Sequence, residues 1–278
     1  MLETRQIRRV IDMALDEDAP HGDLTSEVFV PHDAVATADL AAREPGVFSG
    51  GDVLRIAMTA VDPSVEVGVL VADGDAFAAG ARLATVRGPA RAVLRSERIA
   101  LNLVQRMCGI ATLTAAYVAA AGPGVRVADT RKTTPGLRAL ERHAVRCGGG
   151  HNHRFSLSDA VMAKDNHLAL VDDVTVAIRA ARSRLPHTTH LEVEVDRLDQ
   201  IEPVLAGGVD TIMLDNFDLE DLRKGVEVVD GRALVEASGG VSLETIGAIA
   251  GTGVDVISVG ALTHSVRNLD LGLDVRLS

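Results

Sequence analysis

The sequence has few aromatic residues and few cysteines. Only 2% of its 278 residues are aromatic, with one tyrosine and no tryptophan, so its core must consist of Ala, Val, Leu and Ile side chains. Such side chains suit buried parallel strands covered by helices. Cys108 and Cys147 are the only cysteines, too few for a disulfide framework and not in metal-ligand spacing. We therefore expect both to be reduced thiols in or near the core, as in a cytoplasmic protein.

Further absences argue against membrane-spanning, secreted and nucleic-acid-binding proteins. No stretch of 18 apolar residues runs without a charged or polar residue, so no membrane span is expected. Residues 1–18 carry charges throughout and have apolar residues at helical spacing, which predicts an amphipathic helix and not a secretory signal. The formal net charge of -11 argues against a nucleic-acid partner, because binding a polyanion needs a basic surface.

Turn-forming glycines and prolines divide the first third of the chain. Residues 34–87 contain Pro45-Gly46, Gly50-Gly51 and Asp73-Gly74, with runs rich in β-branched residues between them. This pattern predicts a small meandering sheet. Residues 91–121 then have the apolar spacing of a long helix.

From Val125 onward, short apolar runs alternate with amphipathic stretches. The predicted strands are Val125–Asp129, Val161–Lys164, His190–Val195, Thr211–Asp215, Leu234–Ala237 and Val256–Val259. The last four begin 21 to 23 residues apart, which is the length of one strand, one turn and one helix. Repeated units of this kind predict an α/β fold with a parallel sheet, and several in a row favour a barrel over an open sheet. No G-x-G-x-x-G motif marks a dinucleotide crevice.

Polar residues gather where the predicted strands end. They are Asp129 to Lys132, Lys164-Asp165, Glu192 and Glu194, Asp215, Ser238-Gly239-Gly240, and Gly260. Since reacting groups in a barrel lie at the carboxyl ends of its strands, these positions form the predicted site. Any one of them taken singly is better explained as a solvated loop residue.

Two glutamates alternate along one predicted strand. Glu192 and Glu194 are two residues apart and must face the same side, away from Val193 and Val195. Carboxylates inside a barrel need cations or a metal to offset their loss of water. Together with Asp215 they favour a magnesium-pyrophosphate site, and a structural salt-bridge network is the alternative.

A cationic stretch interrupts this acidic chain. Between Arg126 and Arg154 there are seven arginines and lysines and two acidic residues, a balance of +5. Such a stretch favours a small polyanionic ligand, since arginine matches carboxylate and phosphate oxygens. Some of these arginines, Arg142 especially, are expected to line a solvated helix face. His151 and His153 have no third ligand at useful spacing, so zinc is disfavoured.

Glycines occur at three places next to the predicted site residues. Gly148-Gly149-Gly150 precedes His151 and is expected to let the backbone approach a ligand closely. Ser238-Gly239-Gly240 and Gly260-Ala261-Leu262 each follow a predicted strand and are expected to open a helix. A phosphate held by backbone amides fits both positions, and a tight turn is the alternative.

At these residues the sequence resembles the quinolinate phosphoribosyltransferases, also called carboxylating nicotinate-nucleotide pyrophosphorylases. The motifs that carry the resemblance are Gly22-Asp23-Leu24-Thr25, Ser96-Glu97-Arg98, Asp129 to Arg138, Arg146 to Arg154, Lys164 to His167, Glu192 to Asp196, Leu214-Asp215-Asn216, Glu236 to Gly240, and Val259 to Ser265. One departure is Phe155-Ser156-Leu157, where the family usually has a larger aliphatic residue followed by glycine.

The resemblance implies a fold, an assembly and a set of domain bounds. It implies a small N-terminal α/β sandwich domain (1–108), an incomplete, TIM-like α/β barrel that carries the active site (109–264), and a C-terminal segment that returns to the first domain (265–278). It also implies a cytoplasmic homodimer or hexamer in which Arg98 completes the site of a neighbouring subunit.

The resemblance also implies a role for each site residue. The implied quinolinate binders are Arg98, Thr130, Arg131, Lys132, His153, Arg154 and Lys164. The implied binders of phosphoribosyl pyrophosphate are Lys132, Lys164, Glu194, Asp215, Ser238, Gly239, Gly240, Gly260, Ala261 and His264. Lys132, Glu194 and Asp215 are the implied catalytic residues, and Glu194 and Asp215 the implied ligands of magnesium.

The implied reaction joins quinolinate to phosphoribosyl pyrophosphate, and gives nicotinate mononucleotide, pyrophosphate and carbon dioxide for NAD biosynthesis. Two alternatives share the fold, a relative from the molybdenum-transport gene family and a nicotinate phosphoribosyltransferase. The first would lack the Arg131-Lys132 pair, and the second would not need so many carboxylate-binding cations. A non-catalytic barrel would not retain Glu194, Asp215 and Lys132 together.

Overall fold

The computed structural model describes residues 2–276 and divides into two compact units. The first unit consists of Met1–Ala115, Thr133–Gly149 and Thr263–Ser278, and the second of Ala116–Lys132 and Gly150–Leu262. The domain bounds 1–108, 109–264 and 265–278 stay a prediction. The compact units differ from them chiefly in that residues 133–149 join the first unit.

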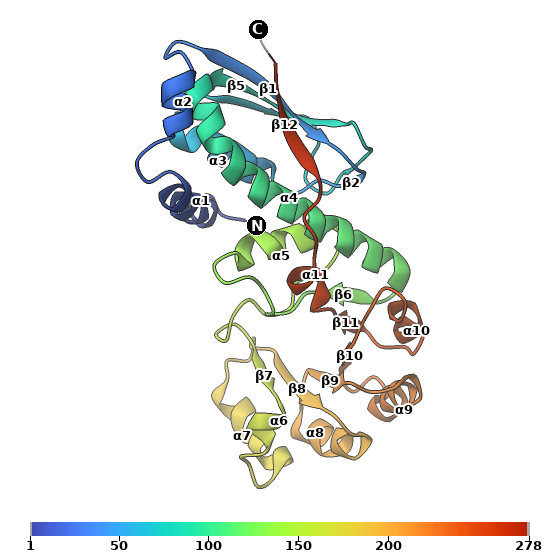
Figure 1. Cartoon of the computed structure of the whole chain (residues 1–278). Helices are drawn as coiled ribbons and strands as arrows, with labels where there is room; N and C mark the ends of the chain where they lie inside the picture. The colour runs from blue at the N-terminus through green and yellow to red at the C-terminus, as the bar shows by residue number, and fades with distance from the viewer. Residues whose placement is uncertain (1, 277–278) are drawn as a thin grey trace. The chain divides into compact units, whose positions relative to one another are not determined.

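An antiparallel sheet of four strands forms the first unit. Its order is β12 (Leu271–Arg276), β1 (Val35–Ala42), β5 (Arg82–Pro89) and β3 (Glu66–Val69), and a separate short ribbon pairs β2 (Gly46–Val47) with β4 (Ala76–Phe77). Leu40 lies opposite Leu273 across β1 and β12. The last strand of the chain thus closes one edge of a sheet that is otherwise built from residues 35–89 (Figure 1).

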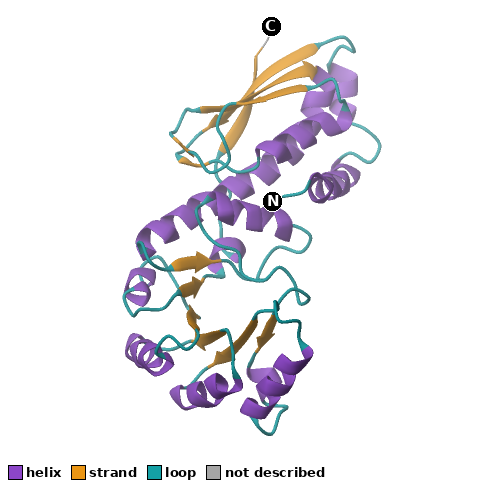
Figure 2. Ribbon diagram, turned by 180° about the vertical axis from the view of Figure 1, so that it is seen from behind, coloured by secondary structure: helices purple, strands orange, loops and turns teal. Residues whose placement is uncertain are grey.

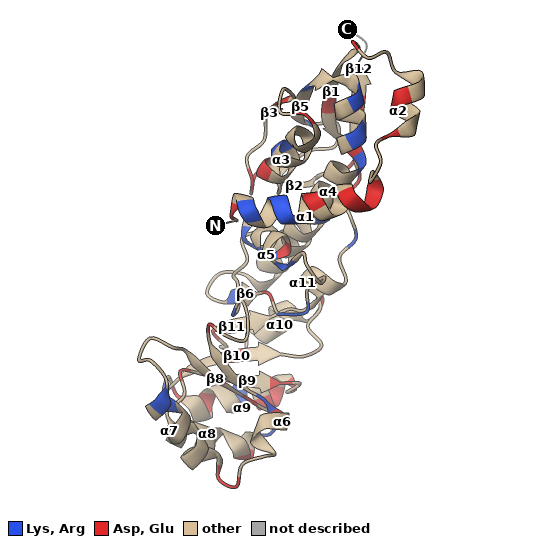
Figure 3. Cartoon of the chain, turned by 90° about the vertical axis from the view of Figure 1, so that its left-hand side faces the viewer, with Lys and Arg blue, Asp and Glu red and all other residues tan. Residues whose placement is uncertain are grey.

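The first unit also contains helices. They are α1 (Thr4–Asp18), α2 (Leu24–Phe29), α3 (Gly51–Val61), α5 (Arg138–Cys147) and the greater part of α4 (Ala90–Ala121). The amphipathic helix predicted over residues 1–18 is confirmed as α1, with Ile7, Val10 and Ile11 buried. Its arginines lie in its first half and most of its acidic residues in its second (Figure 3), opposite to what the helix dipole favours. Packing of its apolar face therefore has to hold α1 in place.

The meandering sheet predicted over residues 34–87 is wrong at one place. Helix α3 occupies Gly51–Val61, with Val53, Leu54, Ala57 and Met58 buried on one face. That spacing is helical, but Gly50-Gly51 indicated a turn and hid it. Gly50 is indeed in the left-handed region, at a φ of 113°, and it starts the helix.

Helix α4 is the long helix predicted over residues 91–121. By length and composition alone it is apolar enough to span a membrane, and 56% of its most apolar window is buried within the chain. Val93, Ala100, Val104 and Ile110 are all fully buried. Burial of this kind is typical of a core helix, so the length and composition of α4 are only weak evidence for a membrane span.

Arg142 corrects another expectation. It was expected on a solvated face of a helix, but it is among the largest fully buried side chains of the chain, with 1% of its surface exposed. Helix α5 also buries Leu140, Glu141, Ala144 and Val145. The helix is therefore enclosed over more than half of its circumference, and charge alone was a poor guide to its exposed face.

Six parallel strands form the second unit. Their order is β6 (Arg126–Ala128), β11 (Val256–Ser258), β10 (Leu234–Ser238), β9 (Thr211–Asp215), β8 (Leu191–Val195) and β7 (Val161–Ala163). Its helices are α6 (Asp165–Leu168), α7 (Val174–Arg184), a 3₁₀ turn η1 (Leu198–Gln200), α8 (Ile201–Gly207), α9 (Leu219–Val229) and α10 (Ile246–Ala250), and the short α11 (Ala261–His264) follows β11. Figure 2 shows the strands in an arc with helices along its outer side.

The arc is an incomplete barrel. Within residues 2–276, β7 pairs with β8 alone, and the edge strand β6 is extended only by a parallel bridge between Ala128 and His151. All six predicted strands are confirmed to within a residue or two at each end. The α/β fold with a barrel left open is therefore the fold of this chain.

Candidate active site

All six strands of the barrel contribute to one cavity of about 370 Å³. Its lining residues are Thr130, Arg131, Lys132, His153, Arg154, Met162, Lys164, Glu194, Met213, Asp215, Ser238 and Ser258. Most of them lie at or just beyond the carboxyl end of a strand, where the sequence predicted a site. A second cavity of about 830 Å³ shares Glu194 and Asp215 and is also lined by Asp165 and Asn216.

One side of the smaller cavity is cationic. Arg131, Lys132, Arg154 and Lys164 all line it. Burial, and then the nearby charge of Arg131, lower the pKa of Arg154 from its ordinary value. The two guanidinium groups therefore disfavour each other, and an anion between them would relieve that repulsion.

Glu194 lines the same cavity and pairs with Lys164. In the register of β7 and β8, Ala163 lies beside Val193, so Lys164 and Glu194 are neighbours one residue further on. The Lys164 ammonium forms an ion pair with Oε2 of Glu194. As the alternation predicted, Val193 and Val195 are buried on the other side of the strand.

Asp215 projects to the same side of the sheet as Glu194. Glu194 lies opposite Met213 in the register of β8 and β9, and Asp215 is two residues beyond Met213. Because side chains two residues apart share a face, the two carboxylates line one cavity from adjacent strands.

The turn after Asp215 has an unusual backbone. Asn216 has a φ of 60°, which few residues other than glycine adopt, and its N–H donates to the Ser238 carbonyl over 2.9 Å. Its side chain donates to Oδ2 of Asp215 over 2.6 Å. Gly239, at a φ of 94°, faces this turn, and a Cβ there would lie 2.2 Å from Oδ1 of Asn216. The carboxylate and the Ser238-Gly239 turn are therefore held as one rigid group.

His153 is anchored by two glutamates inside the barrel. Its Nε2 lies 3.0 Å from Oε2 of Glu192 and 3.6 Å from Oε2 of Glu236, and each glutamate is only 3% exposed. Nδ1 of His153 accepts the Arg154 N–H over 2.7 Å, so in the neutral ring the hydrogen is on Nε2 and points at the glutamates.

These charges change the pKa of the histidine and of one glutamate. Burial alone would lower the pKa of His153, but the bond to Glu192 and the charges of Glu236 and Asp129 outweigh it and raise it. Burial, and then the charge of Glu192, raise the pKa of Glu236. Oε1 of each glutamate is buried without a hydrogen-bond partner in the described part of the chain. The network thus favours the protonated forms of His153 and Glu236.

A buried aspartate shapes the loop that carries His153. Asp129 has no exposed surface and accepts from the Asn152 side chain over 2.6 Å and from the His153 N–H over 2.9 Å. Further along, Asp159 accepts from the N–H groups of Phe155 and Ser156 at 2.7 and 2.6 Å. The side chain of Ser156 joins this turn by donating to Asp159 over 2.9 Å, so serine is accommodated there.

Several predicted residues are not among those that line the cavity. Arg98 belongs to the first unit, where it lines a separate cavity of about 390 Å³ with Asp18, Asp23 and Arg95. His264 is exposed, with Nδ1 2.6 Å from the Ser265 hydroxyl. The remaining ones follow the ends of two strands: Gly239 and Gly240 lie in the turn after β10, Gly260 lies between β11 and α11, and Ala261 begins α11.

The glycine runs differ partly from their predicted roles. Gly260 directly precedes α11, as expected, but no helix opens at Ser238: Gly239 and Gly240 both have positive φ, and α10 begins only at Ile246. A Cβ on Gly148 would lie 2.4 Å from the Ala111 carbonyl of α4. Gly148 is therefore required for the close packing of α5 against α4, and not for the approach of a ligand.

Sequence reasoning overlooked Glu236 as a site residue. Its signal was present, since Glu236 is two residues before Ser238 on β10 and so faces the same side. Met162, Met213 and Ser258 also line the cavity and were not selected. Apolar residues and a lone serine carry no signal of a site.

Comparisons with known proteins show which proteins this chain is similar to. The family model "Quinolinate phosphoribosyl transferase, N-terminal domain" matches residues 23–108, and the corresponding "C-terminal domain" matches residues 110–274. A nicotinate-nucleotide pyrophosphorylase [carboxylating] of Mycobacterium leprae is 47% identical over 275 residues, which cover 96% of each chain. A probable enzyme of the same name from Bacillus subtilis is 40% identical, over 98% of this chain and 94% of its own. Among solved structures, NadC from Streptococcus pyogenes is 41% identical, with a TM-score of 0.96, and covers 100% of this chain and 99% of its own.

Proposed function

This chain belongs to the quinolinate phosphoribosyltransferase family, and we propose that it makes nicotinate mononucleotide from quinolinate and phosphoribosyl pyrophosphate, releasing pyrophosphate and carbon dioxide. The relatives that carry the name nicotinate-nucleotide pyrophosphorylase [carboxylating] align over nearly the whole chain. The single observation that carries the proposal is the cavity at the strand ends, which combines four cationic side chains with two carboxylates. The reaction makes a pyridine nucleotide and belongs to NAD biosynthesis.

The cationic side suits a small dicarboxylate. Arg131 and Arg154 can each bind one carboxylate of quinolinate through paired N–H donors, and Thr130 and Lys132 lie beside them in the cavity. The anion would remove the mutual repulsion that lowers the pKa of Arg154. His153 is fixed in orientation by Glu192 and Asp129, so it can serve as a rigid polar wall for the ring.

Other residues of the cavity suit the ribose and its phosphates. Glu194 and Asp215 can stabilise the positive charge that develops on the ribose as pyrophosphate departs, and Lys164 next to Glu194 can contact a phosphate oxygen. The turn at Ser238, Gly239 and Gly240 and the start of α11 at Gly260 and Ala261 offer backbone N–H groups for the 5′-phosphate, with His264 at the end of that helix.

Glu194 and Asp215 fit a magnesium ion. They are two hard oxygen ligands on one side of adjacent strands, and magnesium is typically held by one or two carboxylates together with substrate phosphates and water. Lys164 already balances one of the two charges, so the site leaves about one negative charge for the ion and its pyrophosphate. When bound, magnesium would offset charge on the departing pyrophosphate.

The chain's own residues then account for the chemistry. The ring nitrogen of quinolinate is a weak nucleophile beside a carboxylate, so Arg131 and Arg154 must hold it in line with the anomeric carbon. Such orientation contributes up to roughly 7–11 kcal/mol to lowering a barrier. The nitrogen–carbon bond forms as the bond to pyrophosphate breaks, with Lys132 beside the developing negative charge. The positive charge of the ribosylated nitrogen then stabilises the electron pair that stays on the adjacent ring carbon as carbon dioxide leaves, and a proton adds to that carbon.

We also propose the assembly and the compartment. Arg98 would enter the site of a partner subunit in a homodimer or a hexamer, since its own cavity in the first unit contains none of the residues that line the cavity at the strand ends. The two free cysteines and the absence of any need for an oxidising environment fit the cytoplasm.

Release of labelled carbon dioxide tests the proposed function. The enzyme should release it from carboxyl-labelled quinolinate only when phosphoribosyl pyrophosphate and magnesium are both present, and should form nicotinate mononucleotide in equal amount. A chain that accepted nicotinate and released no carbon dioxide would be a nicotinate phosphoribosyltransferase instead. A chain that turned over neither compound would contradict both readings.

A further inference from the structure

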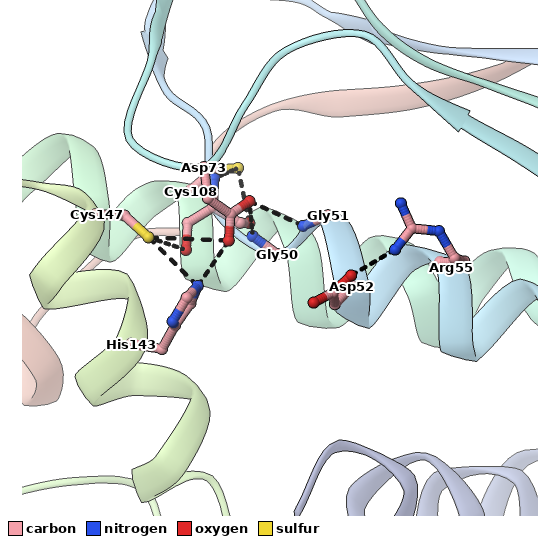
Figure 4. A network of polar contacts seen from close by, with 9 residues as sticks. Gly50, Gly51, Asp52, Arg55, Asp73, Cys108, His143 and Cys147 are labelled. Atoms are coloured by element: carbon pink, nitrogen blue, oxygen red, sulfur yellow. Dashed lines mark hydrogen bonds and ion pairs between the residues drawn. The ribbon is translucent and has the colours of Figure 1, made fainter. Parts of the chain in front are cut away.

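A second cluster of polar side chains lies in the first unit, among residues that the proposed reaction does not use. Asp73 lies in the turn between β3 and β4, and His143 and Cys147 are one helical turn apart on α5. Figure 4 shows the three side chains pointing toward one another. About 70 residues separate Asp73 from the other two, so the fold and not the sequence brings them together.

Three different ligand atoms converge on one point. Nε2 of His143 lies 2.6 Å from Oδ2 of Asp73 and 3.4 Å from Sγ of Cys147, and that sulfur lies 3.9 Å from the same carboxylate oxygen. All three atoms lie within 4.8 Å of one another. A thiol, an imidazole nitrogen and a carboxylate oxygen are the ligand types that zinc takes in proteins.

The arrangement does not fit a catalytic relay. In a Cys–His–Asp relay the acid holds one ring nitrogen and the nucleophile the other. Here the carboxylate and the sulfur both face Nε2, so the histidine cannot pass a proton from one side of its ring to the other.

Two of the three distances fit a tetrahedral ion. Zinc bonds of about 2.0 Å to nitrogen and oxygen and about 2.3 Å to sulfur, at tetrahedral angles, separate N from O by about 3.3 Å and separate S from either of them by about 3.5 Å. Two of the three observed separations are within about 0.4 Å of these values. Only the hydrogen bond between His143 and Asp73 has to open, by about 0.7 Å, to admit the ion.

Outer contacts hold two of the ligands in place. Oδ1 of Asp73 accepts from the N–H groups of Gly50 and Gly51 at 3.0 Å each, which leaves Oδ2 to face the cluster. The Ser49 hydroxyl donates to Sγ of Cys147 over 3.3 Å. Such contacts orient metal ligands and raise the affinity of a site. The side chains of His143 and Asp73 remain 27% and 29% exposed, so an ion and a water molecule have a path to them.

The other cysteine is engaged elsewhere. Cys108 is fully buried and its sulfur contacts the backbone N–H and carbonyl of Ser49 at 3.4 and 3.5 Å. Burial raises the pKa of its thiol to about 12, so it is a neutral thiol and a poor metal ligand. It therefore offers a matched cysteine control.

We propose that Asp73, His143 and Cys147 form a site for one zinc ion, with a water molecule as the fourth ligand. The ion would tie helix α5 to the turn before β4 and so hold together two of the segments that make up the first unit. The proposal does not depend on the reaction assigned to the barrel, because none of its three ligands lines the cavities at the strand ends.

Metal titration of the full-length chain tests the site. After removal of metals with a chelator, the protein should bind one equivalent of zinc in competition with a chromogenic chelator. Cobalt in its place should give the absorption of a tetrahedral ion together with a thiolate-to-cobalt charge-transfer band. A wild-type chain that binds no zinc, or a cobalt complex without the thiolate band, would overturn the proposal.

Single substitutions assign the ligands. Cys147→Ser, His143→Ala and Asp73→Asn should each weaken zinc binding by at least about tenfold, since even the loss of an outer contact costs that much. Asp73→Asn keeps an oxygen for Gly50 and Gly51, and so spares the start of α3. Cys108→Ala and the barrel variant Asp215→Asn should bind zinc as the wild type does. Equal affinity in all five variants would place the zinc elsewhere, whatever their activity, and the wild-type cobalt spectrum remains decisive should a variant fail to fold.

Discussion

Arg131 and Arg154 lie side by side in the cavity, and both are proposed to bind the carboxylates of quinolinate. Replacing either by alanine should weaken quinolinate binding by about 2–4 kcal/mol, the cost of losing a charge-assisted bond to a desolvated carboxylate. Binding of phosphoribosyl pyrophosphate should change much less. Calorimetric titration of each ligand checks this, with Arg146→Ala, an exposed arginine of α5, as the control. Equal losses for both ligands would contradict the assignment.

Glu194 and Asp215 should control the need for magnesium. Glu194→Gln and Asp215→Asn remove one charge each and keep the shape of the side chain, so turnover should fall and the magnesium concentration for half-maximal rate should rise. Quinolinate affinity should stay nearly the same, because the cationic side of the cavity is unchanged. Rates measured across a magnesium series decide the matter, with the exposed Glu227→Gln as control. Unchanged magnesium dependence in both variants would mean that the ion binds elsewhere.

Glu236 should make stability depend on pH. Its pKa is raised from 4.5 to about 7 by burial and by Glu192, so the folded chain binds a proton that the unfolded chain has released. Wild-type stability should therefore fall as pH rises from about 4.5 through 7, and no such contribution is lost below that range. Glu236→Gln should flatten this fall by roughly 1–3 kcal/mol, given about 1.4 kcal/mol for each pKa unit. Unfolding midpoints in urea at pH 5 and pH 8 measure it, and parallel curves for the two proteins would refute it.

At the scale of helices and strands, two glycines offer a matched pair. Gly148 ends α5 and Gly251 ends α10, both at negative φ (-75° and -68°), so alanine is compatible with either backbone. They differ in their surroundings, because a Cβ would lie 2.4 Å from the Ala111 carbonyl at Gly148 but 3.5 Å from its nearest neighbour at Gly251. Gly148→Ala should cost about 1–3 kcal/mol through overpacking, and Gly251→Ala less than about 0.5 kcal/mol. Thermal unfolding of both variants checks this, and similar midpoints would show that α4 and α5 can move apart.

The same scale shows what local patterns can predict. The strands of the barrel were recognisable because buried parallel strands are continuous apolar runs that end in polar residues, as in Thr211–Asp215. Helix α3 was missed because Gly50-Gly51 indicates a turn as readily as the start of a helix. Arg142 was misjudged because charge usually predicts exposure, and the enclosure of α5 depends on elements distant in sequence.

The candidate site, like the fold, could be predicted only where a local sequence pattern marks it. Residues at strand ends, such as Glu194 and Asp215, follow from the rule that barrels place their sites there. The contact of His153 with Glu236 was not identified, although the alternation of side chains along β10 puts Glu236 on the same face as Ser238. The meeting of Asp73 with His143 had no local signal at all, since it depends on packing between segments far apart in the chain.

At the scale of the whole molecule, we expect no active monomer. Arg91 and Arg95 are held by carbonyls of Val30 and Ala19 in their own chain, and Arg98 follows them on the same face of α4. Mixing an inactive Arg98→Ala chain with an inactive Lys132→Ala chain should regenerate activity, because each mixed dimer then has one site with both residues intact. Activity measured after demonstrated subunit exchange is the readout. Should none return, Arg98 acts within its own chain.

The pairing of β12 with β1 has a consequence for how the chain is made. The first sheet needs residues 271–276 to complete its edge, and these are translated after its other strands and after every strand of the barrel. The barrel strands, by contrast, all lie within residues 126–258 and can pair while synthesis is still under way. The sheet whose first strands precede the barrel in the sequence is therefore completed only after the barrel, and ribosome-bound chains halted before residue 271 should contain a folded barrel and a first sheet that still lacks its edge strand.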